Sequence, residues 1–263
     1  MDEDRQLAAW LSAWGDCHVI GRLLGGYRNS VLLVEREHGR GNERENGRFV
    51  AKSSRRSREA IAWLEPVQEA ARAAGFVVPR LVPSVAGELQ VGGVTLETWI
   101  EGGPPAEGEL ARVLHLVRNF HYLTRDLPQR PGFASSLELL EVERGGDADL
   151  SGMPENLVQA CRDAWRQLQG ERLSAVHGDL NAGNLLITPA GRIALLDWDE
   201  ARVDVSALDE AALAFGSADE TGPRSHHDLR ALLAWEVAVS WQAEPEYARR
   251  LGQRLFAGQT FGR

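Results

Sequence analysis

Residues 176–199, with the sequence VHGDLNAGNLLITPAGRIALLDWD, hold the densest group of side chains that could do chemistry. Within this segment His177, Asp179 and Asn184 follow the spacing H-x-D-x-x-x-x-N. In phosphoryl transfer, a carboxylate at the second position of this pattern receives the proton of the attacking hydroxyl, and the Asn holds a metal ion. The segment therefore predicts a site for phosphoryl transfer.

The elements around these residues bring a second carboxylate to them. Two apolar runs, 185–188 and 193–196, flank a Pro-Ala-Gly-Arg tetrapeptide, which is typical of a β-hairpin. If the last residue of the first run pairs with the first residue of the second, Asn184 lies opposite Asp197 at the open end. Mg²⁺ takes one or two protein oxygens and completes its shell with water and phosphates, so we expect these two residues to hold Mg²⁺. The alternative, that such residues only cap turns, explains three of them around one hairpin poorly.

Lys52 is the single lysine among 29 basic residues. It ends a Val-Ala-Lys strand ahead of a predicted helix, as does the kinase lysine that meets the α- and β-phosphates and pairs with a helix Glu. We expect Glu59 to be that partner, with Glu65 or Glu69 as alternatives if the helix begins elsewhere. A solvent-exposed lysine without a role is the competing interpretation.

Together these motifs resemble the aminoglycoside phosphotransferase family, small-molecule kinases related to choline kinases that share the protein-kinase fold. The resemblance covers residues from about 19 to 200 and is carried by Val50-Ala51-Lys52, Leu96-Glu97-Thr98-Trp99-Ile100-Glu101-Gly102, His177-Gly178-Asp179-Leu180-Asn181-Ala182-Gly183-Asn184 and Asp197-Trp198-Asp199. It implies an α+β, two-lobed fold with a small antiparallel β lobe carrying one helix and a larger, mainly helical lobe. The implied activity is that of a kinase: an ATP-dependent transferase that phosphorylates an alcohol group.

The resemblance also implies how a nucleotide would be bound. Thr98 would offer a carbonyl and Ile100 an N–H to adenine, and the loop that contains Gly25, Gly26 and Ser30 would lie over the phosphates. This loop has two adjacent glycines instead of G-x-G-x-x-G, so its sequence does not decide between nucleotides. ATP is the expected nucleotide, and GTP stays open.

In the catalytic loop the resemblance implies that Asp179 is the catalytic residue and that His177 braces the loop through hydrogen bonds. The family usually has His-Pro where this chain has Asn181-Ala182. Neither position is expected to touch the metal, so the chemistry should persist.

Acidic side chains could receive a cationic acceptor. Asp199 and Glu200 follow the metal-binding Asp, and Glu236 lies on a predicted helix further along the chain. Residues 104–263 carry 16 basic and 24 acidic side chains, which would attract a cationic small molecule such as an aminoglycoside.

Hydrophobic periodicity and breaker residues divide the chain into a β-rich lobe at 1–100, a hinge at 101–105 and a helical lobe at 106–263. The resemblance implies that the first lobe binds the nucleotide and that the second holds the catalytic loop, the metal-binding hairpin and the acceptor site. Predicted strands cover 19–24, 31–35, 49–52, 89–100, 185–188 and 193–196, and predicted helices cover 57–74, 107–124, 154–170, 206–215, 225–242 and 245–256.

Composition excludes several other classes of protein. The chain of 263 residues is 43% hydrophobic and 25% charged, as expected of a globular protein, and its net charge of −9 disfavours a nucleic-acid partner. An acidic start and the lack of a long apolar run predict neither an export signal nor a membrane span, and the two cysteines favour the reducing cytoplasm. Oligomeric state leaves no signal in the sequence.

A nucleotide-binding regulator without turnover, like a pseudokinase, is the alternative function. Intact Lys52, Asp179, Asn184 and Asp197 argue against it, because loss of one of these residues usually marks such proteins.

Overall fold

The computed structural model describes residues 3–23, 30–36, 47–106, 109–215 and 226–258. The chain forms two compact units, one of residues 1–68 and 78–102 and the other of residues 69–77 and 103–263. The sequence analysis assigns residues 69–77 to the first lobe, whereas they group with the second unit. The two units are described separately below.

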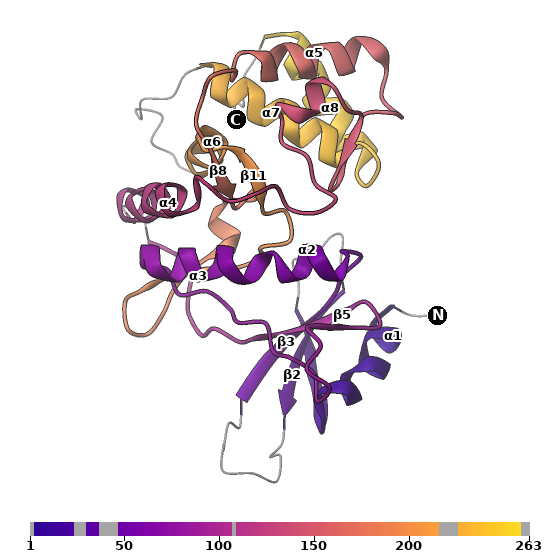
Figure 1. The fold of residues 1–263 in the computed structure, drawn as a ribbon, viewed down its shortest axis with the longest axis vertical. Coiled ribbons are helices and arrows are strands. Elements are labelled where there is room, and N and C mark those ends of the chain that lie inside the picture. Colours follow the sequence, from indigo (N-terminus) through magenta and orange to yellow (C-terminus); the bar gives the residue numbers. More distant parts are fainter. Residues whose placement is uncertain (1–2, 24–29, 37–46, 107–108, 216–225, 259–263) are drawn as a thin grey trace. The chain divides into compact units, whose positions relative to one another are not determined.

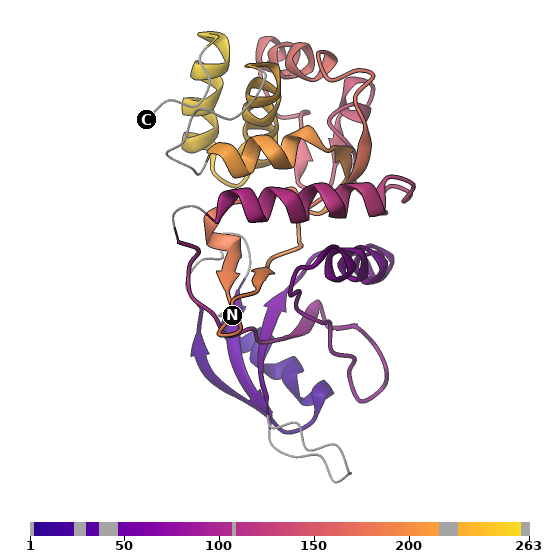
Figure 2. The same cartoon turned by 90° about the vertical axis from the view of Figure 1, so that its left-hand side faces the viewer.

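The first unit is built on a five-stranded antiparallel sheet in the order β1-β2-β3-β5-β4 (Figure 1). Helix α1 (Glu3–Trp10) and the 3₁₀ helix η1 (Leu11–Trp14) lie beside this sheet (Figures 1 and 2). The strands are β1 (Cys17–Arg22), β2 (Val31–Arg36), β3 (Gly47–Ser53), β4 (Gln90–Val91) and β5 (Val94–Thr98). The sequence analysis predicts the sheet but misses α1 and η1.

Strand alternation separates the core face of this sheet from the face that carries Lys52. Phe49 and Ala51 of β3 are buried in a core with residues of α1, η1, β2 and β5. Lys52 lies directly opposite Thr95 on β5, and its side chain therefore projects from the other face. The sheet thus presents its lysine away from the hydrophobic core.

The predicted helix at 57–74 is two helices, α2 (Arg58–Ala62) and α3 (Leu64–Ala74). Pro66 explains the break, because proline has no N–H to donate to the carbonyl of Ala62 and its ring crowds that carbonyl. Ser57 caps α2 by accepting a hydrogen bond from the Ala60 N–H at 3.2 Å.

The second unit contains most of the helices and three pairs of short antiparallel strands (Figure 2). Its centre is α7, whose residues from Ala231 to Ser240 are all buried except Glu236. The elements are α4 (Leu110–Thr124), η2 (Glu138–Leu140), β6 (Arg144–Gly145), β7 (Ala148–Asp149), α5 (Glu155–Arg166), β8 (Leu173–Val176), η3 (Ala182–Asn184), β9 (Leu185–Ile187), β10 (Ile193–Leu195), β11 (Arg202–Val205), α6 (Ala207–Phe215), α7 (His226–Ser240) and α8 (Pro245–Phe256). The helices follow the predicted positions, whereas β8 and β11 are not predicted.

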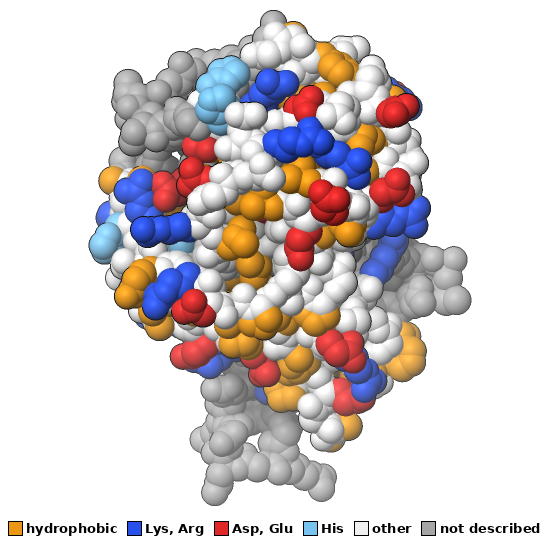
Figure 3. Space-filling model, turned by 45° about the horizontal axis from the view of Figure 1, so that its top comes forward, with side chains coloured by type: hydrophobic (Ala, Val, Ile, Leu, Met, Phe, Trp, Pro, Cys, Tyr) orange, Lys and Arg blue, Asp and Glu red, His pale blue; other side chains and the backbone are white. Residues whose placement is uncertain are grey.

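On the face drawn in Figure 3, acidic and basic side chains are interspersed with apolar ones. Cys17 and Cys161 are both free thiols, and burial raises the pKa of Cys161 to about 12. Among the helices that the structure describes, none is long and apolar enough to span a bilayer.

Candidate active site

The predicted catalytic segment leaves the sheet pair β8–β11 at a sharp turn. β8 pairs with β11 along its whole length, and Val176 lies opposite Arg202. Gly178 follows with a φ of +85°, and a Cβ on it would lie 2.5 Å from the carbonyl oxygen of Glu200. Only glycine fits this turn without strain, so the close approach of the two segments fixes the path of the chain.

A buried carboxylate, Asp209 of α6, holds the backbone of this turn. Its oxygens accept hydrogen bonds from the N–H groups of His177, at 2.8 Å, and Gly178, at 3.0 Å, and from Nε2 of His121, at 3.0 Å. Burial acts to raise the pKa of Asp209, but the hydrogen bonds and charges of His121 and His177 outweigh it and keep the pKa below its ordinary value. Asp209 is therefore an anionic anchor for the segment.

Asp209 is missed by the sequence analysis, which treats residues 206–215 only as a predicted helix. An acidic residue in the first turn of an otherwise apolar helix, Ala207–Phe215, is the signal that could have identified it.

Two amides orient the carboxylate of Asp179. Nδ2 of Asn181 donates to Oδ1 at 2.7 Å, and Nδ2 of Asn184 donates to Oδ2 at 2.9 Å and to the Asp179 carbonyl at 2.8 Å. Asn181 also accepts from the N–H of Gly183 at 2.8 Å, which closes the turn at η3. Asn181, one of the departures from the family pattern, thus contacts the predicted catalytic carboxylate.

The hairpin β9–β10 corrects the predicted register by one residue. Leu185 pairs with Leu195, and the Leu196 N–H donates to the Asn184 carbonyl at 2.9 Å, so Asn184 faces Leu196 instead of Asp197. The cause is the turn: Gly191, with a φ of +71°, closes a loop of three residues where the sequence analysis assumes four.

Asp197 lies one residue beyond this pairing, with a φ of +58°, the one positive value among the described residues other than glycine. Nε2 of His177 donates to the Leu196 carbonyl at 2.7 Å, and its ring meets the edge of Trp198 with centroids 4.9 Å apart. His177 thus contacts the residues on both sides of Asp197.

The side chain of Arg130 binds backbone carbonyls that follow Asp197 in the chain. This side chain is 1% exposed, and its Nη1 donates to the carbonyls of Asp199 at 2.8 Å and Ala201 at 2.9 Å, with Trp198 at 3.4 Å. A buried guanidinium that binds three carbonyls within residues 198–201 holds the loop in one conformation. The sequence analysis gives Arg130 no role.

The donor set at the open end of the hairpin fits a divalent cation such as Mg²⁺. Because Asn184 directs its NH₂ group at Asp179, its Oδ1 points elsewhere and can act as a ligand. The carboxylate of Asp197 would supply the second oxygen. Among the described residues there is no group of three or more His, Cys, Asp or Glu that could hold a metal ion.

In the first unit, Lys52 forms an ion pair with Glu97 of β5, with Nζ 3.2 Å from Oε2. Glu97 lies on the same sheet face as Lys52, diagonal to it across the ladder, within reach of a long side chain. The sequence analysis instead expects Glu59, which is exposed and whose pKa is lowered by its own backbone N–H and by Ser57. Glu59 thus interacts with groups at the N-terminus of α2, and the partner of Lys52 comes from the neighbouring strand β5.

The predicted adenine contacts lie at the end of β5. The Trp99 N–H donates to the Arg48 carbonyl of β3, so by strand alternation the peptide groups of Thr98 and Ile100 face away from β3. The Thr98 N–H and hydroxyl are bonded to Arg80, but its carbonyl and the Ile100 N–H have no hydrogen bond within the described part of the chain. This edge therefore offers one acceptor and one donor.

The remaining predicted residues are placed as follows. Ser30 is buried, and its N–H donates to Oγ of Ser53 at 3.0 Å, whereas Gly25 and Gly26 lie outside the described residues. Asp199 and Glu200 lie in the loop whose carbonyls bind Arg130 and Arg202. Glu236 lies beside Tyr247 of α8; burial raises the pKa of Tyr247, and the charges of Glu236 and Glu244 raise it further.

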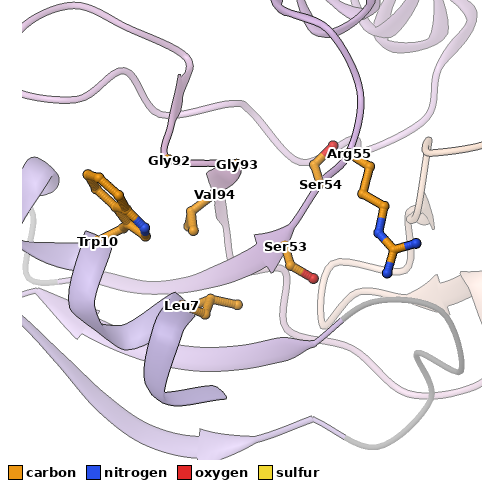
Figure 4. A pocket seen from close by; sticks show the side chains of 8 residues that line it. All are labelled: Leu7, Trp10, Ser53, Ser54, Arg55, Gly92, Gly93 and Val94. Carbon is orange, nitrogen blue, oxygen red and sulfur yellow. The ribbon is translucent and has the colours of Figure 1, made fainter. Parts of the chain in front are cut away.

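A cavity of about 180 Å³ in the first unit involves none of the predicted site residues (Figure 4). Trp10 borders it at one end and Arg55 at the other. A Cβ on Gly92 would lie 2.2 Å from the Trp10 ring, so the Gly92-Gly93 turn is shaped by its packing against α1. The cavity lies beside this contact between the Gly92-Gly93 turn and Trp10, and we assign it no function.

Comparison with known proteins identifies the class. The sequence profile of the phosphotransferase enzyme family matches residues 19–249. The chain therefore belongs to the phosphotransferase enzyme family, and the predicted resemblance and enzyme class, an ATP-dependent phosphotransferase, are confirmed. Among proteins with curated descriptions, no sequence matches the chain.

Solved structures establish the fold as that of the protein-kinase-like small-molecule kinases, which confirms the predicted fold class. An amicoumacin kinase, solved with AMP-PNP, Ca²⁺ and Ami, is 15% identical with a TM-score of 0.69 over 99% of this chain and 95% of that one. A choline kinase from Streptococcus pneumoniae is 15% identical with a TM-score of 0.63 over 98% and 99% of the two chains. An aminopropanol kinase associated with a microcompartment is 16% identical with a TM-score of 0.60 over 97% and 94%.

Proposed function

We propose that this phosphotransferase moves the γ-phosphoryl group of ATP to a hydroxyl of a small cationic molecule. The observation that carries the proposal is the Asp179 carboxylate, whose two oxygens are each fixed by an asparagine amide while the group stays partly exposed. A carboxylate held in this way is positioned to orient an acceptor hydroxyl and to receive its proton.

The chain's other site residues would position the nucleotide. Lys52 would bind phosphate oxygens after leaving Glu97 or while still paired with it, and Asn184 and Asp197 would hold Mg²⁺. When bound, Mg²⁺ would neutralise charge on the phosphates. Thr98 and Ile100 would bind the adenine edge through the carbonyl and N–H that face away from β3. In this proposal the first unit binds nucleotide, the second binds the acceptor, and residues 101–105 act as the hinge.

The cationic acceptor is supported by charge and by the similar structures. Residues 104–263 hold 24 acidic against 16 basic side chains, and Asp199, Glu200 and Glu236 are among them. Choline and aminopropanol, named in two of the similar structures, each combine a hydroxyl with a nitrogen that is positively charged at neutral pH. ATP and two free thiols both favour the cytoplasm as the place of reaction.

The test compares two aspartates that the proposal gives different roles. Asp179→Ala should lower the rate of phosphoryl transfer by about 10²- to 10⁴-fold and leave Mg·ATP binding nearly unchanged, because it removes the partner of the acceptor. Asp197→Ala should weaken Mg·ATP binding as well. Binding is measured by calorimetry with Mg·AMP-PNP, and the same titration with Mg·GTP tests nucleotide choice.

Acceptors are then compared at saturating Mg·ATP. Choline, aminopropanol and an aminoglycoside serve as cationic acceptors, and glycerol serves as the neutral control. Transfer to glycerol alone would contradict a cationic acceptor. Normal transfer by Asp179→Ala would contradict the assignment of the catalytic residue.

A further inference from the structure

A second cavity, of about 330 Å³, lies in the second unit between α4, β8 and the start of α6. The residues that matter for its chemistry are Arg118, Arg125, Arg172, Ser174, Ser206 and Glu210. None of them belongs to the candidate active site. A cavity of this volume is large enough for a small ligand.

The charge of this cavity is opposite to that of the surrounding half of the chain. Its lining has three arginines against one glutamate, whereas residues 104–263 hold 16 basic and 24 acidic side chains. Three guanidinium groups at one hollow attract an anion, and in forked geometry they bind its oxygens in pairs.

The three arginines differ in how they are engaged. Arg118 forms a forked pair with Glu210, with Nε and Nη2 donating to the two carboxylate oxygens at 3.1 and 2.7 Å. Arg125 lies over the Tyr122 ring, 4.3 Å from its centroid, donates to the Tyr122 carbonyl, and forms an ion pair with Asp126, with Nε 3.4 Å from Oδ2. Arg172 is exposed, and within the described residues its guanidinium has neither a hydrogen bond nor an ion pair. Arg172 is therefore available to a ligand.

A buried hydroxyl points to the same ligand. Ser174 is 2% exposed, and its Oγ has no hydrogen-bond partner within the described residues. An unsatisfied buried hydroxyl is costly, and the cavity that Ser174 lines is where its partner could lie. Since the hydroxyl can donate, an oxygen of an anion would satisfy it.

We propose that this cavity binds a phosphate group, either as free phosphate or as a small phosphomonoester. Arg172 would bind two of its oxygens and Ser174 a third, while Arg118 and Arg125, each paired with a carboxylate, border the cavity. A tetrahedral dianion with several acceptor oxygens matches a lining of guanidinium and hydroxyl donors. The cavity also contacts His121, which binds the carboxylate of Asp209 and so lies next to the anchor of the catalytic segment.

The experiment measures the unfolding temperature of the full chain against the concentration of inorganic phosphate, at fixed pH and ionic strength, with chloride as the replacement anion. A parallel titration with glycerol 3-phosphate tells a phosphomonoester from free phosphate by which of the two binds more tightly. Arg172→Gln and Ser174→Ala test the cavity. Arg249→Gln, at an exposed arginine of α8 away from its lining, is the matched control.

Lys52→Ala separates this cavity from the proposed nucleotide site, which could also bind phosphate. We expect a saturable rise in unfolding temperature for the wild type, Arg249→Gln and Lys52→Ala, and at least a tenfold weaker apparent affinity in Arg172→Gln and Ser174→Ala. Unfolding temperatures without phosphate show whether each variant folds.

Two results would overturn the proposal. One is a wild type that neither phosphate nor glycerol 3-phosphate stabilises beyond chloride. The other is phosphate binding that Arg172→Gln and Ser174→Ala retain, and loss of binding in Lys52→Ala alone would assign the phosphate to the nucleotide site. Neither result bears on phosphoryl transfer by Asp179, so the two proposals can fail separately.

Discussion

The predicted catalytic segment of the second unit and the Lys52 face of the first unit are held by different kinds of contact. Around Asp179 the backbone itself is bound by buried charged side chains. Asp209 accepts hydrogen bonds from two N–H groups, and Arg130 donates to carbonyls beyond Asp197. Lys52 is instead held by strand register and by a single ion pair with the buried Glu97, in which the two side chains are 18% and 11% exposed.

This difference separates a preorganised region from an adjustable one. Removing one partner from a buried charged network leaves several other buried groups unpaired and costs several kcal/mol, whereas in a single ion pair the cost of taking two charges out of water offsets much of their attraction. A lysine that binds phosphate can exchange its partner for phosphate more readily when the ion pair contributes little net stability. A carboxylate that must meet a hydroxyl at a fixed place gains from a rigid loop.

Asp209→Ala should have the largest effect on stability. It leaves the N–H groups of His177 and Gly178 and the ring of His121 without their buried acceptor, and we expect a loss of about 3–5 kcal/mol in the free energy of unfolding. Urea unfolding measures it. Asp163→Ala, at an exposed partner of Arg166 on α5, is the control and should change the free energy by less than about 1 kcal/mol. Equal effects of the two substitutions would remove the contrast between the regions.

Gly178→Ala should come next. Its φ of +85° is unfavourable for alanine, and the added Cβ would lie 2.5 Å from the Glu200 carbonyl oxygen and 2.7 Å from Nη1 of Arg202. We expect a loss of about 2–4 kcal/mol, of which about 1–2 kcal/mol is backbone strain. Gly191→Ala measures that strain alone, because Gly191 has a φ of +71° and no atom within 4 Å of an added Cβ. The steric part is refuted if the two variants lose the same stability.

Acid should weaken the preorganised region through Asp209. Its pKa in the folded chain is lower than its ordinary value of 3.8, so its contribution to stability is complete above that value and is lost as the pH falls through the lowered pKa. Unfolding free energies measured from pH 5 down to pH 2.5 should therefore fall more steeply in the wild type than in Asp209→Asn, which has no carboxyl group at this position. Parallel pH curves for the two proteins would contradict an anionic anchor at Asp209.

The sequence predicts the elements that local patterns define. Alternation in β2 and β3, helical periodicity in α4, α7 and α8, and the hairpin signals around Gly191 all act over a few residues, and the structure has these elements. The register of the hairpin depends on one residue more or less in its turn, and hydrophobic pattern alone does not count turn residues, so the predicted pairing was wrong by one position.

The contacts that hold the candidate site could not be predicted in the same way. Asp209 and Arg130 reach the catalytic segment from elements 31 and 68 or more residues away, and nothing in the local sequence of either marks its partner. The partner of Lys52 was missed for a related reason. Glu97 lies on β5, which is next to β3 in the sheet but distant from it in sequence, whereas Glu59 is close to Lys52 in sequence only.

The smallest expected effect belongs to the Lys52–Glu97 pair, and it tests the adjustable side of the comparison. In a double-mutant cycle of Lys52→Met and Glu97→Gln, we expect a coupling energy of about 0.5–2 kcal/mol from urea unfolding, because the pair is a single contact whose side chains, 18% and 11% exposed, keep some access to water. Glu97→Gln alone removes the carboxylate that competes with phosphate for Lys52 and so should not weaken Mg·AMP-PNP binding measured by calorimetry, whereas Lys52→Met should weaken it. A coupling energy as large as the loss in Asp209→Ala would mean that Lys52 is as firmly fixed as the catalytic segment. Weaker nucleotide binding in Glu97→Gln would mean that the glutamate positions the lysine for phosphate instead of competing for it.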